Sequence, residues 1–191
     1  MEISGVQRYS FIDYPGHIST VVFTQGCNFS CQYCYNSQLI PQINGLIDEA
    51  EVFKFLKQRE DMIEGVVISG GEPTIQADLI PFIQKVKKLK FKIKLDTNGS
   101  RPEVLRAVLE EGIDYIAMDI KTCLDAQKYQ KVCNTNANFL GQVEQSMSLI
   151  VASGINYHFR TTLDCDLISE DDKKQLMKHI GDSIHIFQCK K

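Results

Sequence analysis

The sequence predicts an α/β fold in which parallel strands form a partial (βα)6 barrel. Six β-branched and apolar runs alternate with helical patterns, which is typical of a parallel sheet with helical connections. Glycines follow three of the helical segments, where a left-handed residue commonly ends a helix. Polar or glycine-rich segments follow several of the strands. A chain of 191 residues has an ordinary length for one domain, so we expect a single domain over residues 1–191.

The expected strands are short runs rich in Val, Ile, Thr, Tyr and Phe. In parallel α/β folds, binding and catalytic groups gather at the carboxyl ends of the strands. We therefore expect the polar segments after these strands to meet at one edge of the sheet. The strands are Ser19–Gln25, Gly65–Ser69, Phe91–Asp96, Tyr115–Ile120, Asn156–Thr161 and Ile184–Gln188.

The expected helices carry recognisable signals at their ends. Asp48 and Ser169 are expected N-caps, because their side chains can accept hydrogen bonds from free backbone N–H groups. Gly112, Gly154 and Gly181 are expected at C-terminal ends. The helices are Asp48–Gln58, Ala77–Leu89, Pro102–Glu111, Leu124–Lys131, Phe139–Ser153 and Glu170–Ile180.

Composition and charge exclude several classes of protein. The 24 acidic side chains outnumber the 21 basic ones, and a weakly acidic chain is a poor candidate for general binding of nucleic acid or membrane surfaces. The Lys-rich stretch 85–94 is interpreted as a solvated helix face. No run approaches the roughly 18 apolar residues of a membrane helix, and the first residues lack the apolar core of a signal peptide. We therefore expect a cytoplasmic protein without nucleic-acid or membrane partners.

The most informative feature is a C-x3-C-x2-C loop formed by Cys27, Cys31 and Cys34. Cytoplasmic cysteines bind metals or act in catalysis more often than they form disulfides. Soft thiolates suit zinc or an iron–sulfur centre, yet a structural zinc site or an ordinary four-iron cluster takes four ligands. Three thiolates on a cubane would leave one iron open to a substrate. Zinc with a remote fourth ligand and unrelated free cysteines are the alternatives, and nothing in the spacing groups the other cysteines, at 123, 133, 165 and 189.

Three further segments place polar groups after strands. The pair Gly70-Gly71 would let the backbone approach a ligand closely, although a plain tight turn is the alternative. The segment 96–99 offers donors and acceptors, with a turn held by local side-chain bonds as the alternative. Asp119 and Lys121 share one face of a strand because they are two residues apart, and a structural ion pair is their alternative interpretation.

The cysteine loop, with Tyr33 before the third cysteine, resembles the signature of the radical S-adenosylmethionine (SAM) superfamily. In that family the open iron of a [4Fe–4S] cluster binds SAM. One electron then cleaves SAM to methionine and a 5′-deoxyadenosyl radical, which abstracts a hydrogen atom. The resemblance implies that Cys27, Cys31 and Cys34 are the catalytic cluster ligands. It makes Tyr33 the aromatic near the adenine, with ordinary packing as the alternative.

Other motifs resemble one branch of the superfamily, the activating enzymes of glycyl radical enzymes. The segments 11–16, 23–27, 35–36, 95–99 and 117–121 carry the resemblance, while 159–162 and 186–188 fit less specifically. The chain looks closest to the short activators of anaerobic ribonucleotide reductase and is similar to pyruvate formate-lyase activators. The implied partners are a glycyl radical enzyme, most specifically anaerobic ribonucleotide reductase, and an electron donor such as reduced flavodoxin or ferredoxin.

The resemblance also implies which residues bind SAM. The GGEP segment would bind the SAM amino group, and Asp119 and Lys121 would bind its ribose and carboxylate. A monovalent cation is expected near Asp96, Thr97 and Asp119. His185 is interpreted as an ordinary core or surface histidine. The expected cofactor-binding residues are Tyr33, Asn36, Gly70, Gly71, Glu72, Pro73, Asp96, Thr97, Asn98, Asp119, Lys121 and Arg160.

Two other functions remain open on the sequence. One is a radical SAM enzyme that acts on a small molecule, such as a ring contraction in deazapurine synthesis. The other is a thiolate metal module that stores zinc or transfers electrons without catalysis. The absence of a conventional catalytic triad fits the radical reading, because there the cofactor carries the difficult step.

Overall fold

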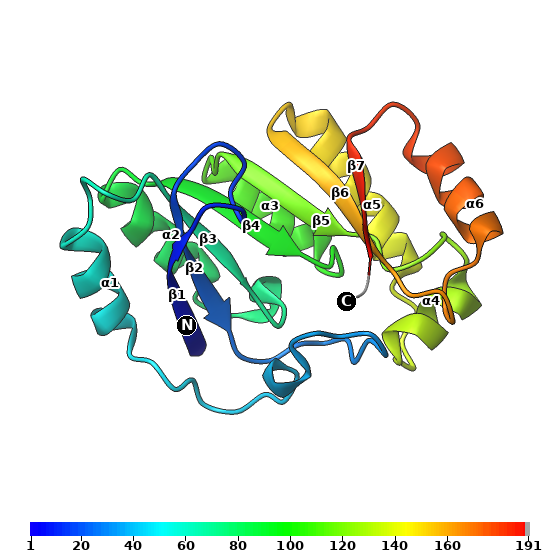
Figure 1. Cartoon of the computed structure of the whole chain (residues 1–191), viewed down its shortest axis with the longest axis horizontal. Coiled ribbons are helices and arrows are strands. Elements are labelled where there is room, and N and C mark those ends of the chain that lie inside the picture. The colour runs from blue at the N-terminus through cyan, green and yellow to red at the C-terminus, as the bar shows by residue number, and fades with distance from the viewer. Residues whose placement is uncertain (190–191) are drawn as a thin grey trace.

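The computed structural model describes residues 1–189 and contains a seven-stranded sheet with helices packed against it (Figure 1). The strands lie in the sheet in the order in which they follow along the chain. They are β1 (Ile3–Ser10), β2 (Ser19–Thr24), β3 (Gly65–Gly70), β4 (Lys92–Thr97), β5 (Tyr115–Asp119), β6 (Asn156–Leu163) and β7 (His185–Cys189).

The helices connect the strands, as the alternating pattern predicts. The longest described helix has 14 residues, and within residues 1–189 no helix is long and apolar enough to cross a membrane. The α-helices are α1 (Glu49–Lys57), α2 (Leu79–Lys88), α3 (Pro102–Glu110), α4 (Ala126–Cys133), α5 (Leu140–Ser153) and α6 (Glu170–Ile180), and two 3-10 helices are η1 (Ser37–Leu39) and η2 (Pro73–Ile75).

Strands β2 to β7 pair in parallel, which confirms the predicted sheet. The prediction of six strands was nevertheless wrong by one, because β1 pairs antiparallel with β2 at the edge of the sheet. Its sequence contains Gly5 and the exposed Gln7 and Arg8, and only its two end residues are buried. Such a segment has no alternating pattern of its own, so its strand conformation comes from pairing with the buried β2.

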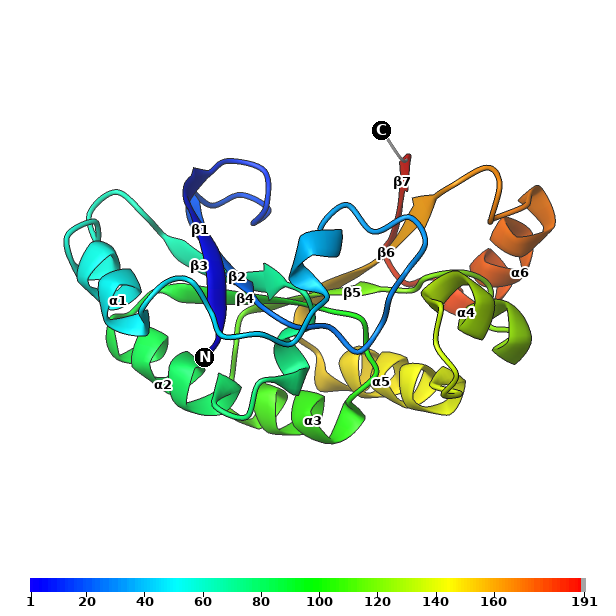
Figure 2. The ribbon, with the colours of Figure 1, turned by 90° about the horizontal axis from the view of Figure 1, so that it is seen from below.

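Most of the helices cover one side of the sheet, and the other side is covered only in part. Figure 2 shows α1, α2, α3 and α5 below the sheet, while the loop after β1 and strand β7 rise on the other side. The helices bury the apolar side of the sheet in one continuous core, with Ile68, Ile93, Leu95 and Ile116 fully buried at its centre. The opposite, concave side remains open as a trough, which is the geometry of a partial barrel.

The concave side of the sheet changes from apolar to charged along the strands. Near the amino ends, Tyr14, Val21 and Val67 form a small buried cluster with Phe23 and Tyr115 beside it. Toward the carboxyl ends, acidic and basic side chains take the same face, because residues two apart on a strand point the same way. The charged end of the trough lies where the sequence predicts the site.

Local signals at the helix ends are largely confirmed. Asp48 accepts a hydrogen bond from the N–H of Ala50 at 2.9 Å, and Ser169 forms a reciprocal capping box with Asp172. The three predicted C-terminal glycines all have positive φ angles. Helix α4 begins and ends two residues later than predicted, because Asp125 acts as its N-cap by accepting from the N–H of Lys128. Helix α2 begins two residues later than predicted.

Candidate active site

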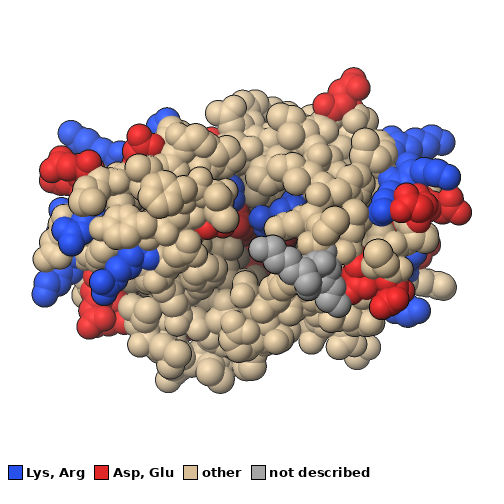
Figure 3. Space-filling model, in the orientation of Figure 1, with Lys and Arg blue, Asp and Glu red and all other residues tan. Residues whose placement is uncertain are grey.

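A cleft of about 260 Å³ lies at the carboxyl ends of the parallel strands. Figure 3 shows the cleft as a central hollow with charged atoms at its base. Most other charged side chains of that face gather at the two ends of the molecule. Every predicted site residue except Pro73 lines the cleft. Pro73 is instead buried at the start of η2, where its fixed backbone angle suits the first turn of a helix.

Several lining residues had no predicted role. Some of them stood in segments that carry the family resemblance, so position in a motif was the available signal; these are Asp13, Phe23, Tyr35, Thr162 and Gln188. The others follow only from the fold. The lining residues without a predicted role are Asp13, Phe23, Phe29, Tyr35, Ile40, Ser69, Thr162 and Gln188.

The cysteine loop is anchored by an aromatic side chain inside it. Phe29 is 2% exposed and packs against Tyr129 of α4 and against Phe139, with ring centroids 6.4 and 5.1 Å away. This contact fixes the middle of the loop to the core while the flanking Cys27 and Cys31 remain half-buried. The loop is therefore held in place by packing in the protein alone.

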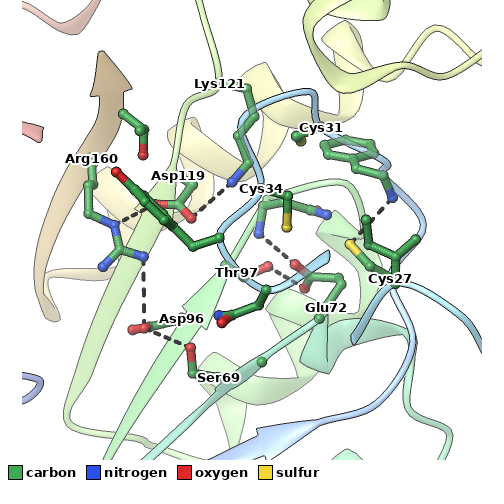
Figure 4. Close-up of a pocket in the computed structure, with 18 of the residues that line it drawn as sticks. Cys27, Cys31, Cys34, Ser69, Glu72, Asp96, Thr97, Asp119, Lys121 and Arg160 are labelled. Carbon is green, nitrogen blue, oxygen red and sulfur yellow. Dashed lines mark hydrogen bonds and ion pairs between the residues drawn. The ribbon is translucent and has the colours of Figure 1, made fainter. Parts of the chain in front are cut away.

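The three thiols lie along one side of the cleft, as Figure 4 shows. Burial raises the pKa of Cys27 to about 12 and also raises the pKa of Cys34. The pKa of Cys31 falls to about 7, chiefly through its interaction with the thiol of Cys133. Cys133, which nothing in the sequence grouped with the loop, contacts it through its backbone, because its carbonyl accepts from the Ser30 N–H at 2.9 Å.

The glycine pair of the GGEP segment is required by packing inside the protein. A Cβ atom at Gly71 would overlap the carbonyl oxygen of Gly26, at the start of the cysteine loop. A Cβ atom at Gly70 would overlap the backbone of Thr24, and the φ angle of Gly70 is +116°. The two glycines thus allow the turn after β3 to lie directly against the strand and loop that carry Cys27.

Glu72 is buried, with 1% exposure, and its carboxylate faces the protein. It accepts hydrogen bonds from Thr97 Oγ1 and from the Asn98 N–H, both at 2.7 Å, and from Thr74. Burial raises its pKa, although these hydrogen bonds oppose the shift. Glu72 therefore joins the turn after β3 to the end of β4, and Figure 4 shows its bond to Thr97.

The end of β4 is in turn joined to the cysteine loop. The amide of Asn98 donates to Asn28 Oδ1 at 3.0 Å, and the amide of Asn28 donates to Ser100 Oγ at 2.7 Å. The cysteine loop, the turn after β3 and the end of β4 thus form one hydrogen-bonded unit in the cleft wall. For residues 96–99 the sequence left a turn held by local side-chain bonds as the alternative. Such a bond is present as well, since the Ser100 N–H donates to Asn98 Oδ1.

A chain of ion pairs crosses the other side of the cleft. Asp119 accepts from Lys121 Nζ at 3.0 Å and from Arg160 Nε at 2.6 Å, and Arg160 reaches Asp96 at 3.8 Å. Burial alone would raise the pKa of Asp119, but the charges of Lys121 and Arg160 outweigh it and hold the pKa well below its usual range. Asp96 also pairs with the buried Lys94.

These ion pairs bear on two predictions. The ion pair between Asp119 and Lys121 does form, and both side chains still line the cleft. The carboxylates of Asp96 and Asp119 are already balanced by Lys94, Lys121 and Arg160, so a monovalent cation would share its ligands with them. The cation stays a prediction.

Comparisons with known proteins decide the family. Residues 21–180 match the sequence model of the radical SAM superfamily. The chain belongs to this superfamily. It is 32% identical over 185 residues to a Methanocaldococcus jannaschii protein with the provisional name of glycyl-radical enzyme activating enzyme. That match covers 94% of this chain and 75% of the relative.

Two further proteins match this chain over less than half of their own length. A Pyrococcus horikoshii protein provisionally named GTP 3′,8-cyclase is 28% identical over 152 residues, which are 71% of this chain and 47% of the relative. The SAM-bound structure of Streptococcus suis SuiB superposes with a TM-score of 0.69 at 16% identity, covering 87% of this chain and 39% of SuiB. This likeness confirms the fold. The chain thus spans less than half the length of either protein.

Membership of the superfamily implies a [4Fe–4S] cluster and SAM, and the residues of the cleft fit both. Within residues 1–189, no three His, Cys, Asp or Glu side chains lie close enough to bind one metal ion. Cys27, Cys31 and Cys34 all line the cleft, and three thiolates could each bind a different iron of a four-iron cluster.

Proposed function

We propose that this radical SAM enzyme is an activating enzyme that generates a glycyl radical on a partner protein. The observation that carries the proposal is an exposed apolar pair beside the cleft. Phe11 and Ile12 are 75% and 87% exposed, and the next residue, Asp13, lines the cleft. Tyr35, at 52% exposure, lines it as well. Large apolar side chains grouped at a site are typical of a surface that binds another protein.

The open trough supports a protein substrate for a second reason. The helices cover one side of the sheet, and on the other side the β1–β2 loop and β7 stand apart (Figure 2), with the cleft reaching the surface beside the exposed Tyr35. A small metabolite is usually held in an enclosed pocket. A glycine-bearing loop of a folded partner requires an open approach instead, and the trough supplies it.

The proposed roles of the cleft residues follow from their chemistry. Cys27, Cys31 and Cys34 hold the cluster. Lys121 and Arg160 bring positive charge toward the SAM carboxylate, and Asp119 offers oxygen atoms to the ribose hydroxyls. When bound, the reduced cluster and SAM supply a radical that removes a hydrogen atom from a glycine Cα. A glycine C–H is too weakly acidic for an ordinary base, so the cofactor supplies the difficult step. The chain itself binds and orients the reactants and excludes water from the site.

The remaining predicted residues contribute to the shape of the proposed SAM site. Tyr33 and Asn36 line the cleft on the cysteine loop, and the turn at Gly70 and Gly71 brings backbone close to the cluster ligands. Glu72 keeps that turn against β4 and acts as a positioning residue. Pro73 contributes by starting η2.

The sequence resemblance extends the proposal to the partner and the setting. We propose anaerobic ribonucleotide reductase as the partner and a reduced flavodoxin or ferredoxin as the electron donor. A monovalent cation near Asp96, Thr97 and Asp119, a cytoplasmic location and a single radical SAM domain over residues 1–191 complete the proposal. The M. jannaschii relative supports the activating role, since its match extends over 94% of this chain.

A radical SAM enzyme of small molecules is the second candidate. The observation in its favour is the relationship to the provisional GTP 3′,8-cyclase of P. horikoshii, at 28% identity. That match covers 71% of this chain, against 94% for the activating-enzyme relative. The match to the cyclase therefore covers less of this chain than the match to the activating-enzyme relative.

Anaerobic reconstitution with iron and sulfide, followed by SAM and dithionite, tests the proposal. Recombinant anaerobic ribonucleotide reductase, pyruvate formate-lyase and GTP are added separately. The measured products are 5′-deoxyadenosine and the electron paramagnetic resonance signal of a glycyl radical. Cys31→Ala serves as the control that cannot hold a complete cluster.

We expect 5′-deoxyadenosine together with a glycyl radical on the reductase, and neither product with Cys31→Ala. A radical on pyruvate formate-lyase alone would retain the activating role and change the partner. Consumption of GTP without a protein partner would replace the proposal with the small-molecule alternative.

A further inference from the structure

The loop between β1 and β2 carries exposed and buried side chains next to each other. Phe11 and Ile12 are 75% and 87% exposed, and Asp13 lines the cleft. Tyr14, the next residue, is only 2% exposed. Burial of a large aromatic ring contributes substantially to stability, so a surface loop is held where such a ring is buried. Tyr14 therefore fixes the loop directly beside the side chains of the proposed partner contact.

The ring of Tyr14 lies on Gly65, the first residue of β3. A Cβ atom at Gly65 would lie 2.8 Å from Tyr14 Cδ1 and 2.9 Å from Tyr14 Cε1, closer than real Cβ atoms approach a neighbour. Gly65 has no positive φ angle, so its backbone conformation does not itself require glycine. The ring that occupies the space explains the missing side chain, and such a close approach is a common reason for glycine within a strand.

Other side chains enclose the same ring. Val21 and Val67, on the concave side of the sheet, form a buried cluster with Tyr14. The rings of His17 and Tyr115 meet Tyr14 edge to face, with centroids 4.9 and 6.0 Å away. Aromatic rings favour this arrangement over a face-to-face stack. The ring is therefore packed against β2, β3 and β5 as well as against its own loop.

Hydrogen bonds fix the loop before and after Tyr14. The buried Ser10, at the end of β1, accepts from the N–H groups of Ile12 and Asp13 at 3.3 and 3.1 Å and donates to the Asp13 carboxylate at 2.5 Å. At the other end, the Glu64 carboxylate accepts from the N–H of Ile18 at 3.2 Å. The Glu64 N–H in turn donates to the Ile18 carbonyl at 2.8 Å. The loop is thus tied to the sheet at both ends and in its middle.

We propose that Tyr14 and Gly65 form an anchor for the β1–β2 loop, which holds its exposed apolar pair and Asp13 in place before a glycine-bearing segment of the partner arrives. A loop that is already ordered loses less conformational entropy on binding than one that has to order at that moment. Tyr14 and Gly65 do not line the cleft, so both are positioning residues. The inference rests on the proposed function, since it gives the loop a role in binding a protein partner.

Gly65→Ala tests the anchor, because its methyl group displaces the Tyr14 ring. Chymotrypsin cleaves after exposed aromatic residues, so the rate of cleavage after Phe11, followed by mass spectrometry, measures how freely the loop opens. The second readout is the KM for the protein partner, beside SAM cleavage by dithionite alone. We expect cleavage about tenfold faster, since it follows the population of the opened loop. The partner KM should rise about fivefold, since ordering loose side chains weakens binding, and SAM cleavage should not change.

Tyr14→Leu is the second variant, because it removes the ring without introducing a clash. It should also speed cleavage and raise the partner KM. In the double variant Gly65→Ala with Tyr14→Leu, the methyl group occupies space that the ring has left, so the combined effect should be smaller than the product of the two single fold-changes. Gly5→Ala is the matched control, since its Cβ would meet Phe23 Cδ2 at 3.9 Å, an ordinary contact. Thermal unfolding of each variant checks the fold.

The outcomes separate this inference from the proposed function. An unchanged rate of cleavage in both Gly65→Ala and Tyr14→Leu would overturn the anchor. Faster cleavage with an unchanged or lower partner KM would overturn the preordered contact, and a lower KM would make the loop a lid that has to open. Loss of SAM cleavage in step with partner activation would place the effect in the SAM site and overturn it as well. Failure of the parent protein to form a glycyl radical would instead contradict the proposed function, while the cleavage rates still test the anchor.

Discussion

Tyr33 donates a 2.8 Å hydrogen bond to the carbonyl oxygen of Lys121, which lies 88 residues further along the chain. On the other side of the same residue, the N–H of Lys121 donates to the hydroxyl of Tyr129 at 3.2 Å. Burial raises the pKa of both phenols, so both remain protonated at neutral pH. The aromatic residue inside the cysteine motif thus also fixes the backbone of a proposed SAM-binding residue.

Tyr33→Phe should weaken the proposed SAM site while sparing the cluster. The variant loses the hydrogen bond to Lys121 and keeps the ring, and such a bond is worth about 1 kcal/mol, or roughly fivefold in binding. We expect the KM for SAM to rise by about that factor with unchanged iron content. Tyr157→Phe is the matched control, since its hydroxyl donates to Ser183 Oγ at 3.1 Å and Tyr157 does not line the cleft. An unchanged KM in Tyr33→Phe would contradict the role.

Gly71→Ala should disturb the cysteine loop. The new methyl group would overlap the carbonyl oxygen of Gly26, which is backbone and cannot rotate away. We expect a lower iron content after reconstitution and a lower Tm. Gly141→Ala in α5 is the control, because open space surrounds its Cβ position. That variant should be more stable, by about 0.5–1 kcal/mol, since alanine favours a helix over glycine. Full cluster loading in Gly71→Ala would refute the packing argument.

Asp119→Asn should destabilise the fold in a pH-dependent way. The side chain is 24% exposed, so losing its pairs with Lys121 and Arg160 should cost about 1–3 kcal/mol, below the cost of a fully buried pair. The native pKa lies below the unfolded value of about 3.9. The stabilisation is therefore complete above that value and is lost as the pH falls through the native pKa.

Urea unfolding of the parent and Asp119→Asn at about pH 7 and about pH 3 measures this difference. The gap in unfolding free energy should shrink at the lower pH. Asp61→Asn, at an exposed position, should show almost no gap at either pH. A gap that is equal at both pH values would contradict the assignment of the low pKa to Asp119.

A double variant, Phe11→Ser with Ile12→Ser, should separate partner binding from SAM cleavage. The two side chains are exposed beside the cleft, so their loss removes apolar area from a proposed contact surface without opening the core. We expect the KM for the protein partner to rise about tenfold, as for loss of an interface anchor. Cleavage of SAM by dithionite alone should not change.

Ile184→Ser provides the control for this pair, because Ile184 is 64% exposed just before β7 and does not line the cleft. In Ile184→Ser, the KM for the protein partner should stay at the value of the parent protein. If Phe11→Ser with Ile12→Ser activates the partner normally, the apolar pair does not bind it.

Much of this fold was predictable from local patterns. The parallel strands β2 to β7 follow from apolar runs of fitting length, and the caps at Asp48 and Ser169 depend on residues within three positions. The gathering of the cysteine loop, the glycine turn, Asp119 and Arg160 at one edge follows from a general property of parallel sheets. Strand β1 escaped prediction because its partner strand, and no pattern of its own, makes it a strand.

The sequence by itself determined the fold class, the cysteine motif and which segments meet in the cleft, because these depend on neighbouring residues and strand order. Only the tertiary structure decided the orientation of side chains between distant segments. It turned the Glu72 carboxylate onto Thr97 and Asn98, placed Tyr33 on Lys121, and brought the end of α4 at Cys133 to Ser30 of the cysteine loop. Such pairings arise when separate elements pack into a shared core, and no local pattern in the chain specifies them.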